Sequence, residues 1–160
     1  MNACEHGYPL CSCEDSEREP LVQEIICEFP PIYPKIAETF NLHGRRDVVF
    51  SFGALLYNPH GLFIPNEILK HEAVHGERQG EGVEDVLNWW QRYIEDSLFR
   101  FVEEAHAHRA EYRWLAVHAG RRDRRRAVKQ VAAKLASPLY GNLVTPAQAR
   151  KVLEAVTYAG

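Results

Sequence analysis

From Asn66 onward, apolar residues recur at the three- and four-residue spacing of amphipathic helices. Glycines and prolines interrupt this pattern and divide it into separate segments. The predicted helices cover residues 66–79, 83–96, 97–118, 123–136 and 145–156. A chain of 160 residues is long enough for one domain of about 150 residues and no more. The pattern therefore predicts a single domain built mostly of helices.

The part of the chain before Asn66 has a more mixed pattern. Short helices are predicted at 21–28, where prolines follow, and at 34–42, where the sequence His43-Gly44 follows. The β-branched and aromatic residues of 47–57 predict a strand, and 62–64 predicts a second strand that pairs back on it. Asn66 is the predicted N-cap of the helix that follows. The expected fold class is α+β and helix-dominated, with a small early sheet or hairpin.

The first 19 residues lack apolar periodicity and predict a mobile acidic tail, with residues 20–160 forming the domain. All four cysteines lie within the first 27 residues. The chain shows no secretory signal, so reduced thiols in a cytoplasmic protein are expected. A zinc knuckle is the alternative that we consider for Cys4, His6, Cys11 and Cys13, although their spacing is tighter than usual. Cys27 is expected to be a small buried apolar residue.

The sequence His71-Glu72-Ala73-Val74-His75 is an H-E-x-x-H motif inside a predicted helix. Residues four apart lie about 40° apart on a helix, so both imidazoles can face one metal ion. Zinc accepts neutral imidazoles, and a catalytic zinc site keeps one position open for water. Glu72 is then placed to act as general base toward that water. The motif predicts a zinc site with His71 and His75 as ligands.

A third protein ligand is expected from the helix predicted at 97–118, which carries Glu103, Glu104, His106 and His108. Glu104 is the preferred candidate because it lies on one stripe with Arg100, His108 and Glu111. Glu103 lies on a different face, beside Phe99 and Trp114, and is the main alternative. The sequence therefore predicts the metal ligands His71, His75 and Glu104.

Together, HEAVH and the sequence Glu104-Ala105-His106-Ala107 after 28 intervening residues resemble the gluzincin group of zinc metallopeptidases. The wider stretch 47–142 resembles small metallopeptidases encoded by bacteriophages and prophages, through HEAVHGERQ, Trp89-Trp90 and Leu139-Tyr140-Gly141. The resemblance implies a zincin-like helix that carries the metal, His71, His75 and Glu104 as ligands, and Glu72 as general base. It also implies hydrolysis of a peptide bond in a bacterial or phage-infected cytoplasm.

Other residues are expected to support this chemistry. The strand predicted at 47–57 could bind an extended peptide by main-chain pairing. Gln79 lies on the same side of its helix as His75 and is a candidate for contact with a ligand. An electrophile that stabilises the tetrahedral oxyanion is also needed, and the sequence leaves four candidates open. They are Arg100, His108, Tyr112 and Tyr140.

Two alternative functions come from other features. A chain with this metal site but without turnover would be a zinc- or peptide-binding regulatory module. The basic residues of 121–134 could contact nucleic acid, but the net charge of −3 and the lack of a groove-reading motif disfavour this. No membrane partner is expected, since the longest apolar stretch, 48–57, is far shorter than a span of about 20 residues. The expected partner is a peptide or protein substrate.

Overall fold

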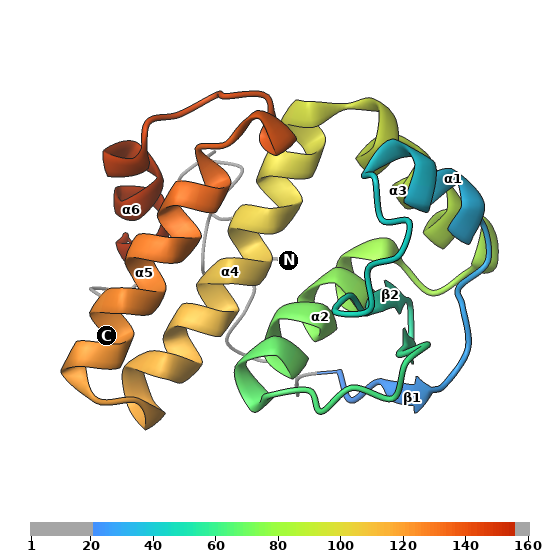
Figure 1. The fold of residues 1–160 in the computed structure, drawn as a ribbon, viewed down its shortest axis with the longest axis horizontal. Coiled ribbons are helices and arrows are strands. Elements are labelled where there is room, and N and C mark those ends of the chain that lie inside the picture. The colour runs from blue at the N-terminus through green and yellow to red at the C-terminus, as the bar shows by residue number, and fades with distance from the viewer. Residues whose placement is uncertain (1–20, 156–160) are drawn as a thin grey trace, which may run out of the picture.

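The computed structural model describes residues 21–155 and has an α+β fold in which helices dominate. Two segments of the first part of the chain are β1 (Glu24–Ile26) and α1 (Tyr33–Thr39), and the hairpin strands are β2 (Phe50–Phe52) and β3 (Leu55–Tyr57). The remaining elements are α2 (Asn66–Gln79), α3 (Val83–Glu95), α4 (Ser97–His118), α5 (Arg121–Leu135), the 3-10 helix η2 (Pro138–Tyr140) and α6 (Pro146–Glu154). The predicted fold class is confirmed, with the small sheet early in the chain (Figure 1).

The sheet has the strand order β1-β3-β2, with β1 parallel and β2 antiparallel to β3. The single strand predicted at 47–57 is wrong, because the chain turns back at Gly53 and forms a hairpin. Gly53 has φ 56°, a left-handed conformation that glycine adopts at little cost. Strand propensity is the same on both sides of the turn, so the pattern did not reveal it.

The helix predicted at 21–28 is also wrong, since its centre is strand β1. The Glu24 amide donates to the carbonyl of Ala54 at 2.8 Å, and the Ile26 carbonyl accepts from Asn58 at 2.8 Å. These backbone groups are thus paired with the hairpin. Such a short segment does not form a stable helix by itself, so pairing with a neighbouring strand is favoured over helix formation. Cys27 follows this strand and is exposed, not buried as expected.

The strand predicted at 62–64 is absent from the part of the chain that the structure describes, where a loop occupies these residues. The Asn58 side chain closes that loop by bonding both the amide and the carbonyl of Leu62 at 2.9 Å. Pro65, not Asn66, is the N-cap of α2, and its carbonyl accepts from the amides of Ile68 and Leu69 at 3.0 Å. Asn58 thus satisfies the two backbone groups of Leu62, which a strand would have paired with another strand.

The helices form a layer in which α4 lies between α2 and α5, and α6 packs beyond α5 (Figure 1). Asp96 caps α4 by accepting from the amides of Leu98 and Phe99. One hydrophobic core joins α1, the hairpin and α3, and a second joins α5, η2 and α6. The helix predicted at 123–136 begins earlier, at Arg121, and the last helix ends at Glu154. No helix in residues 21–155 is both long and apolar enough to cross a membrane.

Candidate metal centre

Helix α2 carries the HEAVH sequence and presents both histidines to α4. His71 and His75 are buried, with 6% and 5% of their surfaces exposed. On another side of α2, Gly76 lies directly against the hairpin: a Cβ atom there would be 2.4 Å from the Gly53 carbonyl oxygen. The absence of a side chain at Gly76 therefore lets the hairpin and α2 pack in close contact.

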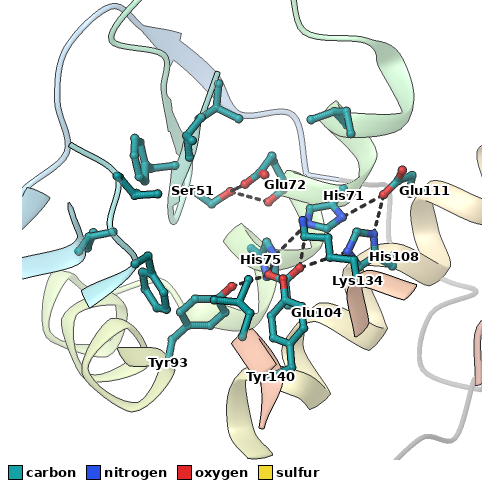
Figure 2. A pocket seen from close by; sticks show the side chains of 18 of the residues that line it. Ser51, His71, Glu72, His75, Tyr93, Glu104, His108, Glu111, Lys134 and Tyr140 are labelled. Atoms are coloured by element: carbon teal, nitrogen blue, oxygen red, sulfur yellow. Dashed lines mark hydrogen bonds and ion pairs between the residues drawn. The ribbon is translucent and has the colours of Figure 1, made fainter. Parts of the chain in front are cut away.

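The side chains of His71, His75 and Glu104 converge at the centre of Figure 2. The two Nε2 atoms lie 3.2 Å apart. Glu104 places Oε1 3.1 Å from His75 Nε2 and Oε2 3.7 Å from His71 Nε2. Ligand atoms around tetrahedral zinc are separated by about 3.3 Å, as bond lengths of about 2.0–2.1 Å require. The three side chains fit a single ion of this kind.

Glu103, the alternative third ligand, points elsewhere. Its carboxylate accepts two hydrogen bonds from the Arg78 guanidinium, each 2.8 Å long, and one from Trp89 Nε1 at 3.0 Å. These bonds fasten α2 and α3 to α4. The structure thus brings Glu104, and not Glu103, to the histidines.

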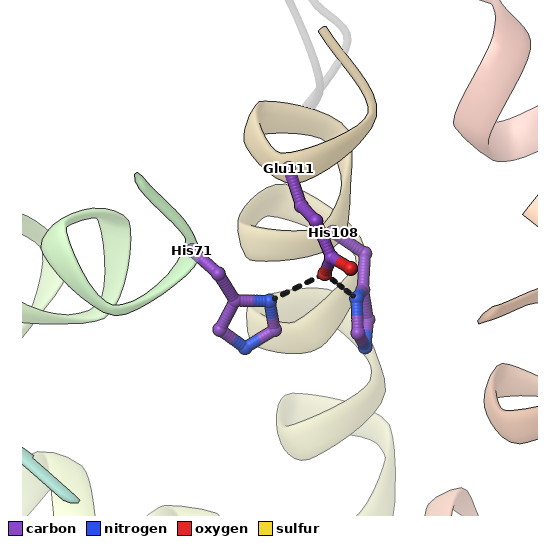
Figure 3. Close-up of side chains that lie close together, drawn as sticks. All are labelled: His71, His108 and Glu111. Atoms are coloured by element: carbon purple, nitrogen blue, oxygen red, sulfur yellow. Dashed lines mark hydrogen bonds and ion pairs between the residues drawn. The ribbon is translucent and has the colours of Figure 1, made fainter. Parts of the chain in front are cut away.

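A second cluster, formed by His71, His108 and Glu111, adjoins the first (Figure 3). Glu111 Oε2 lies 3.3 Å from His71 Nδ1 and 2.7 Å from His108 Nδ1. The shorter distance is typical of a charge-assisted hydrogen bond and is too short for two ligands of one ion. A hydrogen on His71 Nδ1 that bonds Glu111 leaves the lone pair of Nε2 facing His75 and Glu104. Glu111 therefore orients His71, one of the candidate ligands.

Burial and charge are unusual in these two clusters. Burial alone would raise the pKa of Glu104, but the charge of His75 and the hydrogen bond of His108 hold that pKa well below its ordinary value. Burial is likewise outweighed at Glu111, whose pKa falls to about 2 beside His108 and His71. Among the described residues, histidines are the partners in the ion pairs of Glu104 and Glu111. Buried carboxylates beside imidazoles are a donor set that a divalent cation such as zinc can use.

Glu72 lies beside the ligands at intermediate exposure, on the side of the hairpin. The Ser51 hydroxyl, in β2, is 2.7 Å from Glu72 Oε2 and 2.8 Å from the Glu72 carbonyl. A hydroxyl has one hydrogen, so Ser51 can donate to one of these acceptors at a time. Ser51 therefore connects the hairpin to the glutamate of the HEAVH motif.

The residues of the two clusters line one cavity of about 500 Å³, together with Ser51 and Glu72. Its walls come from the segment 45–51, from α1, α2, α3 and α4, and on the opposite side from α5 and η2. Tyr93 donates from its hydroxyl to Glu104 Oε1 at 2.6 Å. Burial, together with the nearby Glu104 carboxylate, raises the pKa of both Tyr93 and Tyr140. Both phenols are therefore neutral hydrogen-bond donors beside the cluster (Figure 2).

The four candidate electrophiles have different surroundings. Arg100 donates to the carbonyls of Tyr93, Ile94 and Leu139, so it links α3 to η2 and does not face the ligands. Tyr112 lines a separate small cavity, whereas Tyr140 lines the large one. His108 bridges Glu111 and Glu104, with its Nε2 atom 3.3 Å from Glu104 Oε2. Tyr140 and His108 are the candidates that lie at the site.

Gln79 has a structural contact in place of the expected contact with a ligand. It is buried, accepts from the Gly53 amide at 2.7 Å and donates to the Ser51 carbonyl at 2.9 Å. Trp90 Nε1 also donates to that carbonyl, at 3.0 Å. The Ser51 carbonyl in β2 is therefore already bonded by two side chains, and the nearby residues Val48 and Val49 line the cavity.

Sequence reasoning assigned no role to Ser51, Tyr93 or Glu111. Glu111 was on the stripe with Glu104 and His108, and its position three residues after His108 was a usable signal. Ser51 reaches the site because the hairpin packs on α2, and Tyr93 reaches it because α3 packs on α4. A local sequence pattern does not predict such packing. Cys4, His6, Cys11 and Cys13 lie outside the described residues, so the predicted knuckle stays a prediction.

Comparisons with known proteins identify no relative. No protein-family model matches the chain, and neither a curated protein nor a solved structure matches it.

Proposed function

We propose that this chain is a zinc-dependent metallopeptidase of gluzincin type that hydrolyses a peptide bond. The observation that carries the proposal is the convergence of His71 Nε2, His75 Nε2 and the Glu104 carboxylate within 3.7 Å in a large cavity. The His71–Glu111 contact supports it, because histidine ligands of zinc commonly donate their second N–H to a carboxylate.

His71, His75 and Glu104 would hold the ion, which when bound supplies a Lewis acid that lowers the pKa of water and polarises a carbonyl. Glu72 takes a proton from the attacking water and delivers it to the leaving amine as the C–N bond breaks. Ser51 holds Glu72 Oε2, so we assign the proton transfer to the other carboxylate oxygen. The neutral hydroxyl of Tyr140 lies at the same site and is our preferred donor to the oxyanion.

A peptide is the substrate class that the cavity favours. A volume of about 500 Å³ lies within the range of small-ligand sites, about 300–1,000 Å³, and holds a few residues of a peptide. Its walls combine apolar side chains, such as Ile36 and Phe40, with the segment Val48–Val49 beside the motif. A stretch of backbone beside the helix that carries the motif suits an extended substrate, which binds through main-chain groups.

The first experiment is the metal content per chain of protein purified without added metal. One zinc per chain in the wild type and in Cys11→Ser/Cys13→Ser, and loss of zinc in Glu104→Ala, are the expected results. A second zinc that disappears with the cysteines would add the knuckle. Absence of stoichiometric zinc after zinc is offered back to the folded protein would overturn the proposed site.

The second experiment separates catalysis from binding. A peptide library made from a digested proteome is incubated with wild type and with Glu72→Gln, and new ends are identified by mass spectrometry. Glu72→Gln should keep its zinc and lose about 10²-fold or more in cleavage rate, because the general base is gone. Equal cleavage by the two proteins contradicts the assignment of Glu72, and zinc without any cleavage favours a non-catalytic peptide-binding module.

A further inference from the structure

One wall of the large cavity is formed by a helix that contributes no residue to the metal ligands or the general base. Gln130, Val131 and Lys134 of α5 line the cavity, and their spacing puts them on one face of that helix. Figure 2 shows the Lys134 side chain extending toward the ligands from α5, whereas Ser51 lies on the side of the hairpin. Lys134 therefore faces the space in which a substrate would lie.

The charges that line the cavity single out this lysine. The cationic side chains other than histidine are Arg45 and Lys134. Arg45 donates two hydrogen bonds to Asp47, at 2.9 and 2.7 Å, and so its charge is already paired. Within residues 21–155, Lys134 has no carboxylate in ion-pair contact. It is the cation of this cavity that remains available to a ligand.

The exposure of Lys134 decides between two roles for that charge. A group that stabilises an oxyanion acts best when it is fixed before the reaction, as the buried phenol of Tyr140 is with 2% of its surface exposed. Lys134 is exposed on a flexible stem, which suits a compact point charge that pairs with an incoming anion. A bound cation would neutralise Glu104, but the cavity carboxylates Glu72 and Glu111 would repel an anionic peptide without a positive charge nearby.

We propose that Lys134 determines substrate specificity by binding a carboxylate of the peptide on the α5 side of the metal site. The carboxylate is either the free C-terminus or an Asp or Glu side chain near the scissile bond. This inference rests on the proposed peptidase function and adds a substrate class to it. Lys134 acts in substrate binding and takes no part in the proton transfers assigned to Glu72.

The test measures binding, so that it does not depend on turnover. Zinc-loaded Glu72→Gln protein is titrated calorimetrically with acetyl-Ala-Ala-Ala and its C-terminal amide, and with acetyl-Ala-Asp-Ala-amide and its Asn counterpart. The same titrations follow after Lys134→Met, Lys134→Glu and Lys129→Met are added separately. Lys129 is the matched control, because it is an exposed lysine of α5 that does not line the cavity.

We expect one of the two carboxylate peptides to bind at least about fivefold more tightly than its neutral partner, the size of a favourable exposed ion pair. Lys134→Met should abolish this ratio, Lys134→Glu should reverse it, and Lys129→Met should preserve it. The pair that shows the ratio identifies the source of the carboxylate. If Lys134→Met keeps the affinity ratio between carboxylate and neutral peptides, the carboxylate binds the metal ion and not Lys134. If each carboxylate peptide binds as tightly as its neutral partner, the site has no preference for a carboxylate. Either result overturns the inference.

The outcome is separable from that of the proposed function. Wild-type cleavage of the peptide library with no carboxylate ratio in the titrations rejects Lys134 alone. A carboxylate ratio that depends on Lys134, without cleavage by the wild type, rejects the peptidase and keeps the binding site. A uniform loss of cleavage for acidic and neutral peptides in Lys134→Met, with unchanged binding ratios, would assign Lys134 to oxyanion stabilisation and also overturn the inference.

Discussion

Glu103 and Glu104 are neighbours in the chain, yet their carboxylates contact different kinds of side chain. Successive residues of a helix point about 100° apart, so a single position separates the proposed metal ligand from a residue that anchors three helices. Glu104 meets two histidines, whereas Glu103 meets Arg78 and Trp89. The two glutamates thus form a matched pair for experiment.

We predict that Glu104→Gln lowers zinc affinity by at least about 100-fold, and that Glu103→Gln leaves zinc affinity nearly unchanged. Glu103→Gln should instead lower the free energy of unfolding by about 1–3 kcal/mol, because it weakens buried bonds to Arg78 and Trp89. Competition with a chromophoric chelator measures the affinity, and urea unfolding measures the stability. The reverse assignment of effects would make Glu103 the ligand.

Glu111 illustrates a residue that acts through another. Its carboxylate contacts His71 Nδ1 and His108 Nδ1. The other ring nitrogen of His71, Nε2, is the one that lies near His75 and Glu104. We predict that Glu111→Ala lowers zinc affinity by about 10–100-fold while the stoichiometry at saturation stays at one, because the preferred tautomer of His71 is no longer fixed. Chelator competition on Glu111→Ala, with the exposed Glu81→Ala as control, measures this. Equal affinities of the two variants would show that Glu111 does not orient His71.

The sequence was most informative where chemistry depends on spacing within one helix. His71 and His75 lie one turn apart, and the stripe through Glu104 singled out the glutamate that the structure brings to them. Ser51 and Tyr93 could not be found in this way, because each meets the site from another element. Long-range packing determines such contacts, and a single sequence contains no record of it.

Among the elements, the contact between the hairpin and α2 positions Glu72, the proposed general base. Gly76 permits this contact, since the nearest atoms to a Cβ there would be Gly53 O at 2.4 Å and Gln23 Nε2 at 2.6 Å. The Ser51–Glu72 hydrogen bond crosses the same interface. A change at Gly76 should therefore be felt both in stability and at Glu72.

We predict that Gly76→Ala lowers the free energy of unfolding by about 1–3 kcal/mol, because the hairpin backbone must move and overpacking outweighs the higher helix propensity of alanine. Gly120→Ala is the control: a Cβ at Gly120 meets no atom within 4 Å, and we expect a loss below about 1 kcal/mol there. Urea unfolding midpoints measure both. Equal losses at the two glycines would show that the close approach to the hairpin carries no cost.

The elements themselves were predictable to different degrees. Helices α2, α3 and α4 began at or within a residue of the predicted positions, because long apolar periodicity and flanking glycines define them locally. Strand β1 was missed because its pairing partner, β3, is about 30 residues away and supplies the hydrogen bonds that decide its conformation. The predicted strand at 62–64 is instead a loop, in which the Asn58 side chain bonds both backbone groups of Leu62.

For the whole molecule, α4 connects the two hydrophobic cores to the proposed metal site. It contributes Glu104, His108 and Glu111, while α2 on one side contributes His71 and His75. An ion bound by side chains of both helices would hold them together only in the folded state. Metal binding would therefore be coupled to folding, and metal affinity would add to the free energy of unfolding.

We predict that zinc at about 1,000 times its dissociation constant raises the unfolding free energy by about 4 kcal/mol. For a domain of this size that corresponds to a rise of about 10 °C in the melting temperature. The rise should be reversed by a chelator and should be absent in Glu104→Ala. Calorimetry on the wild type, with and without zinc, measures it. Cys11→Ser/Cys13→Ser is the control. This variant should keep the full rise in melting temperature, since the proposed ligands on α2 and α4 are intact. Loss of the rise in this variant would place the stabilising ion at the N-terminus and not between the two helices.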